Sequence, residues 1–94
     1  MIIRIVKMTF HPEKVNDFLH LFTENKHHIR NFEGCSNLQL LNDINRPFVF
    51  FTYSYWNNEQ SLEKYRQSEL FNQVWSKTKV LFSDKPEAWS LTEK

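Results

Sequence analysis

Apolar and polar residues alternate along several short segments of the chain, which is the period typical of β-strands. The alternation is loose over Ile2–Phe10, while Ser36–Asn42 supplies Leu38, Leu40 and Leu41 for a second strand and Ala88–Leu91, with Trp89, forms a short last one. The segment Phe48–Trp56, FVFFTYSYW, is the most strongly β-forming part of the chain. These patterns predict four strands, with Phe48–Trp56 in the interior of the sheet.

Two longer segments repeat their apolar residues every three or four positions, which predicts amphipathic helices. The first extends over Pro12–Phe32, and Gly34, the only glycine, is expected to cap it in the left-handed conformation. The second begins at Asn57, with Gln60 at the capping-box distance, and continues to about Phe82. Ser68 interrupts this second pattern, so a bend is expected there.

The resulting order, β-α-β-β-α-β, predicts an α+β fold of the ferredoxin-like type. Its four-stranded antiparallel sheet carries both helices on one face. The strand Phe48–Trp56 presents Phe50 and Trp56 on one side and Phe51, Tyr53 and Tyr55 on the other. Since the helices cover one side only, we expect a second copy of the sheet to cover the other, in a homodimer.

Length and charge narrow the classes of function. With 94 residues, the chain is expected to form one domain over residues 1–94. A formal net charge of +1 with interspersed signs gives no basic surface for nucleic acid or acidic lipid. We find no signal peptide or membrane-spanning segment, and the single Cys35 cannot form an internal disulfide. A soluble, cytoplasmic protein without nucleic-acid or membrane partners is therefore expected.

The segment Phe48–Phe71 has an aromatic strand ending in Trp, a polar turn, an amphipathic helix, and a Ser-containing break before a Phe. Together with FEGC at Phe32–Cys35 and the order of elements, it resembles the antibiotic biosynthesis monooxygenase (ABM) domain. The likeness extends over essentially the whole chain. It implies a dimeric α/β barrel and an oxygenase that acts on quinols or polyketide aromatics without metal or flavin. Other members degrade haem.

The chain departs from that family at several positions. Ser54 stands where many members have an acidic residue, while Tyr65 and Leu70 stand where many have His. Trp75 lies near the position of the axial His in haem-degrading relatives, and an indole cannot ligate iron. The resemblance therefore implies a protein without a cofactor, and these substitutions leave open whether it is catalytic.

The residues themselves favour a small aromatic or apolar ligand. Trp56 and Phe22 are candidates for substrate binding by stacking, and Tyr65 and Trp75 are the candidate catalytic residues, because a buried OH or NH needs a partner. The simpler interpretation is that all four are core residues. His11 is a third candidate for substrate binding at a pocket mouth, or else a turn residue before a proline.

Other polar residues are weaker candidates. Arg4 and Lys7 can bind an anionic substrate if their strand faces look inward, although solvation at a strand edge is more common. His20, Glu24, His27 and His28 have helical metal-ligand spacing, but an exposed set of this kind is usually incidental, and no metal site is expected. Cys35 is expected to be inert.

Three functions remain open. The first is a cofactor-independent monooxygenase that accepts a small planar phenol, quinol or polyketide-like compound. The second is a non-catalytic domain that binds or senses a small ligand on the same fold. The third, a proton-transfer isomerase of similar architecture, lacks an identifiable base.

Overall fold

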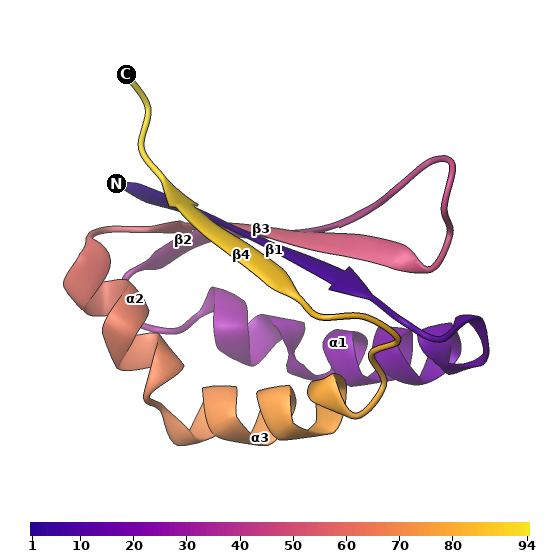
Figure 1. The fold of residues 1–94 in the computed structure, drawn as a ribbon. Coiled ribbons are helices and arrows are strands. Elements are labelled where there is room, and N and C mark those ends of the chain that lie inside the picture. Colours follow the sequence, from indigo (N-terminus) through magenta and orange to yellow (C-terminus); the bar gives the residue numbers. More distant parts are fainter.

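The computed structural model describes residues 1–94, and its sheet is antiparallel and four-stranded. The strands lie in the order β2-β3-β1-β4, which is the ferredoxin-like topology that the sequence predicts. Their bounds are β1 Ile2–Thr9, β2 Cys35–Asn42, β3 Val49–Trp56 and β4 Glu87–Leu91. Figure 1 shows the helices on one side of this sheet, with its other side bare.

The helical layer contains α1 (Val15–Arg30), α2 (Glu59–Arg66) and α3 (Glu69–Lys79), and a short 3-10 turn over Pro12–Lys14 precedes α1. The prediction of one helix over Pro12–Phe32 was thus too long at both ends. Gly34 does adopt a positive φ of 89°, but it lies in the turn that leads to β2 and not directly after the helix. Each helix is too short or too polar to span a lipid bilayer.

The bend predicted near Ser68 is a complete break between α2 and α3. Ser68 Oγ accepts a hydrogen bond from the Phe71 N–H at 3.1 Å and donates to the Tyr65 carbonyl at 2.6 Å. Each helix therefore has its own N-terminal cap. The cap of α2 is Asn58, whose side chain accepts from the Ser61 N–H at 2.8 Å, one residue later than the predicted start at Asn57.

The core lies between the sheet and the helices. Phe10 is fully buried, and its ring stacks on Phe18 at a centroid distance of 4.2 Å and meets the edge of Phe50 at 6.0 Å. Met8 belongs to the same cluster. Burial of each such side chain contributes roughly 1.5–3 kcal/mol to stability, so this cluster anchors α1 to β1 and β3.

The opposite face of the sheet carries a group of apolar side chains and has no covering element within the chain. Ile5 of β1 lies opposite Tyr53 of β3 on one side and Trp89 of β4 on the other. The side chains of Trp89 and Leu91 remain 42% and 46% exposed. On β3, Phe50 and Trp56 are buried on the helix side while Tyr53 shares the bare face with Ile5, so the prediction of aromatic side chains on both faces of this strand is confirmed. Whether a second copy covers the bare face stays a prediction.

Candidate functional site

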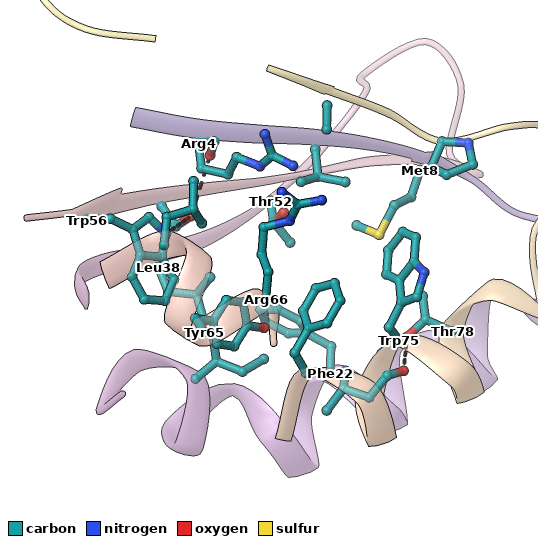
Figure 2. Close-up of a pocket in the computed structure, with 18 of the residues that line it drawn as sticks. Arg4, Met8, Phe22, Leu38, Thr52, Trp56, Tyr65, Arg66, Trp75 and Thr78 are labelled. Atoms are coloured by element: carbon teal, nitrogen blue, oxygen red, sulfur yellow. Dashed lines mark hydrogen bonds between the residues drawn. The ribbon is translucent and has the colours of Figure 1, made fainter. Parts of the chain in front are cut away.

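A cavity of about 330 Å³ lies between the helix-facing side of the sheet and the three helices. Its sheet wall includes Val6, Met8 and Leu38, and its helical wall is mostly aromatic. Figure 2 shows side chains from both layers converging on this space. A volume of this size is at the lower end of what small-molecule sites enclose, so the cavity can hold one small ligand.

Tyr65 lies in the middle of the aromatic wall. Its ring stacks on Trp56 at 4.8 Å and meets the edges of Phe32 and Phe71, each at 5.3 Å. Its hydroxyl points into the cavity (Figure 2). Burial raises the pKa of this hydroxyl well above its usual value, because the phenolate would lose its hydration. Tyr65 therefore stays protonated and can donate a hydrogen bond to a ligand.

Trp56 forms the wall behind Tyr65. Its side chain is 1% exposed, and its indole Nε1–H donates to Ser54 Oγ at 3.0 Å. Ser54 in turn lies 3.5 Å from the Arg4 carbonyl, to which its hydroxyl donates. The serine at the position that is acidic in many relatives thus satisfies a buried N–H group. As a result, the indole N–H of Trp56 is not free to bind a ligand.

Phe22 and Trp75 line the cavity from α1 and α3 (Figure 2). Trp75 stacks on Phe71 with an interplanar angle of 11° and meets the edge of Phe82 at 5.5 Å. Phe22 is tilted against Phe18 at 6.1 Å. Both rings are partly buried, so each packs against the core and still presents surface to the cavity.

His11 does not belong to this group. It is exposed at the end of β1, where its backbone N–H donates to the Leu81 carbonyl and its carbonyl accepts from the Lys14 N–H. It does not line the cavity. Of the five candidate residues, the structure brings together Phe22, Trp56, Tyr65 and Trp75, and it leaves His11 in the turn before the first helix.

Arg4 and Arg66 line the cavity as well. Arg4 faces the helices, whereas Lys7 faces the bare side of the sheet and pairs with Glu87 at 3.6 Å. The alternation of side chains along β1 predicts the direction of Arg4, because Arg4 lies on the same face of the strand as Val6 and Met8. Arg66, the last residue of α2, carries no comparable signal in the sequence. Burial, and then the like charge of Arg66, lowers the pKa of the Arg4 guanidinium.

The chemistry available in the cavity follows from these groups. It contains a protonated phenol and two guanidinium groups around an apolar interior. Glu87 is the one acidic residue at the edge of the cavity, and its carboxylate pairs with Lys7 on the bare face of the sheet. No three His, Cys, Asp or Glu side chains in the structure converge as metal ligands would. The arrangement can hold a flat ligand, donate to an oxygen atom and stabilise negative charge, but it presents no unpaired base.

Comparison with solved structures gives the same fold. A conserved protein from Methanosarcina mazei Go1 aligns with a TM-score of 0.93 and 23% identity, covering 100% of this chain and 94% of that one. An antibiotic biosynthesis monooxygenase aligns with a TM-score of 0.94 and 18% identity, covering 100% and 99%. A protein from Mycobacterium tuberculosis aligns with a TM-score of 0.90 and 13% identity, covering 99% and 94%. At these identities the similarity shows the fold alone.

Sequence comparison identifies the family. No curated protein is similar enough to the chain to match it. The family described as antibiotic biosynthesis monooxygenase matches residues 1–75, which include β1 to β3, α1, α2 and the cavity residues up to Trp75. This agrees with the strand order, the break at Ser68 and the aromatic cavity described above. The chain belongs to the antibiotic biosynthesis monooxygenase family.

Proposed function

We propose that the protein is a cofactor-independent monooxygenase that acts on a small planar phenol, quinol or polyketide-like compound. The observation that carries this proposal is the aromatic cavity into which the protonated Tyr65 hydroxyl points. In a substrate such as an anthrone, oxidation of the CH₂ group beside the phenol ring to a carbonyl supplies the four electrons that O₂ needs, and in a hydroquinone the conversion of the ring to a hydroxyquinone supplies them. One oxygen atom enters the substrate and the other leaves as water.

The cavity residues have separate roles in this proposal. Tyr65 donates a hydrogen bond to the substrate oxygen on which negative charge develops. Phe22 and Trp75 hold the ring system between α1 and α3, and Trp56 fixes the orientation of Tyr65 by stacking on it at 4.8 Å. The apolar walls keep water away from the reactive intermediate.

Oxygen uptake with a panel of hydroquinones and anthrones tests the proposal. Tyr65→Phe is expected to lower kcat/KM by about 10- to 100-fold, because it removes one donor to the developing charge and leaves the aromatic packing in place. Tyr55→Phe is the matched control, since that hydroxyl bonds to the Tyr53 hydroxyl on the bare face, 3.1 Å away. No uptake above background with any compound of the panel would contradict the proposal.

A second candidate function is supported by a specific observation, the lack of an unpaired base in the cavity. Ser54 is bonded to Trp56, and Glu87 is ion-paired with Lys7. A domain that binds a small apolar ligand without turnover fits this arrangement. A compound retained by the purified protein and released unchanged, together with no oxygen uptake, would favour it over the monooxygenase.

We also propose that a second copy of the chain covers the bare face of the sheet. Ile5, Tyr53 and Trp89 lie side by side across β1, β3 and β4 on that face, and Leu41 and Leu91 are 45% and 46% exposed. A face with this much exposed apolar surface is typical of an interface. Packing two such sheets together about a two-fold axis buries it in both copies.

Light scattering is expected to give twice the 11.5 kDa mass of one chain. Ile5→Glu is expected to yield monomers, because it places a charge in the middle of the proposed interface without a partner. Val80→Glu, at a residue 71% exposed after α3, is the matched control and should remain dimeric. A wild-type protein that stays monomeric at micromolar concentration would contradict the assembly.

A further inference from the structure

Two arginines that come from different layers of the fold meet in the cavity. Arg4 projects from β1, a central strand of the sheet, and Arg66 projects from the C-terminal end of α2. Figure 2 shows the Arg66 side chain reaching from α2 toward the sheet, where its guanidinium group ends near Thr52 and close enough to Arg4 for the two charges to interact. All three residues line the cavity. The apolar site therefore has one cationic end.

Arg4 forms no ion pair, and the one carboxylate that acts on its charge, that of Glu63, is bonded to Arg66. The only side-chain hydrogen bond of Arg4 is from Nη1 to Ser90 Oγ at 2.9 Å, and it takes part in none of the ion pairs of the structure. A half-buried guanidinium without a directly paired carboxylate costs free energy that a solvated lysine or an apolar residue at the same position would avoid. Such an arrangement is characteristic of sites that bind a charged group.

The charges around Arg4 indicate how much negative charge a ligand can bring. Arg66 is paired with Glu63, with Arg66 Nη1 3.3 Å from Glu63 Oε2, and its remaining N–H groups are free to bind. Glu87 does not enter this balance, because its carboxylate pairs with Lys7 on the bare face of the sheet. Arg4, Arg66 and Glu63 together leave one positive charge. A single carboxylate balances this charge, whereas a phosphate dianion would exceed it.

We propose that Arg4 and Arg66 form an anion subsite, so that the physiological ligand is a flat aromatic or polyketide-like compound that carries one carboxylate. The guanidinium groups bind the two carboxylate oxygens, and the rest of the ligand lies along Phe22 and Trp75. This inference goes beyond the proposed function, because it concerns the charge of the ligand. It holds whether the protein oxidises the ligand or only binds it.

Calorimetric titration of the full-length protein with 2-naphthoate and its neutral analogue 2-naphthamide tests the subsite. Neither probe is a phenol or quinol, so failure of the oxygenase proposal does not affect the result. Naphthoate is expected to bind at least about 10-fold more tightly than the amide, because its anionic carboxylate forms ion pairs with two guanidinium groups, whereas the amide oxygen is a neutral acceptor. Equal affinities, or no binding of naphthoate at millimolar concentration, would overturn the proposal.

Variants at the two arginines locate the effect. Arg4→Met and Arg66→Met are each expected to weaken naphthoate binding by about 10-fold and to change amide binding by less than about threefold. Because Arg66 is half exposed at a helix end, we expect Arg66→Met to preserve the fold. If Arg4→Met does not fold, the Arg66→Met variant alone tests the subsite. Equal losses for acid and amide would show that the pocket was damaged, and would count against the subsite.

Two further controls separate the subsite from general charge effects. Arg46→Met removes the same charge from the turn between β2 and β3, where Arg46 pairs with Asp43 at 3.4 Å, and it should leave both affinities unchanged. An equal loss in this variant would overturn the proposal. Titration with 1-naphthyl phosphate tests the charge of the ligand, and tighter binding of the phosphate than of naphthoate would refute the assignment to a single carboxylate.

Discussion

Replacement of Trp56 by alanine is expected to lower the free energy of unfolding by about 3–5 kcal/mol. The Trp56 side chain is 1% exposed, stacks on Tyr65 at 4.8 Å and meets the edge of Phe32 at 6.4 Å. Its removal leaves a cavity at the point where α2 rests on β3. Because domains of this size have a total stability of only about 5–15 kcal/mol, much of the stability is lost.

Urea unfolding followed by far-ultraviolet circular dichroism measures this loss, at one protein concentration because a dimer unfolds in a concentration-dependent manner. Ile44→Ala is the matched control, since Ile44 is 96% exposed in a turn and its truncation should change stability by less than about 0.5 kcal/mol. Trp56→Phe keeps an aromatic ring and should fall between the two. A Trp56→Ala variant as stable as Ile44→Ala would contradict the assignment of Trp56 to the core.

Gly34→Ala is expected to destabilise the protein by about 2–4 kcal/mol, from backbone strain and a steric clash combined. Gly34 has a φ of 89°, a conformation that residues with a side chain rarely adopt. A Cβ atom at this position would lie 2.5 Å from Ser61 Cβ on α2. The Gly34 carbonyl also accepts a hydrogen bond from the Asn57 N–H at 2.9 Å, so the turn cannot simply move away. The midpoint temperature of thermal unfolding is expected to fall by about 10 °C or more.

A double-mutant cycle separates the two causes. Ser61→Gly removes the atoms that the new Cβ would meet, at a cost of about 1 kcal/mol for a glycine within α2. In that background, Gly34→Ala is expected to be less destabilising than in the wild type, and the remaining loss measures the backbone strain. If Gly34→Ala lowers the stability of this background as much as that of the wild type, the close approach to Ser61 does not contribute to the destabilisation.

Much of the fold could be predicted from local patterns, and the errors have local causes. The strand Phe48–Trp56 and the amphipathic helices have strong periodicity, so their existence and order were correct. The ends of α1 were wrong because apolar residues such as Phe32 continue the helical period past Arg30, where the chain already turns toward β2. The break at Ser68 was expected as a bend, because the sequence alone does not show that the Ser68 hydroxyl bonds to residues on both sides.

The candidate site was predicted in part. Phe22, Trp56, Tyr65 and Trp75 were singled out as aromatic residues on the apolar faces, and these four line one cavity. Ser54 was noted as a departure from the family, but its bond to the Trp56 indole depends on side-chain positions within β3. His11 was placed near a pocket mouth on sequence position alone, and the direction of the chain after β1 takes it elsewhere.

The sequence by itself determined the order of the elements, the two apolar faces of β3 and the family resemblance, because periodicity and residue type act over a few neighbouring positions. Only the tertiary structure decided which side chains share the cavity and that Arg4 and Arg66 meet there. It also decided that the Trp56 indole N–H donates its hydrogen bond to Ser54. Arg4 and Arg66 lie on different elements and are brought together by the packing of α2 against the sheet. Such a juxtaposition depends on strand register and helix placement, which no short stretch of sequence specifies.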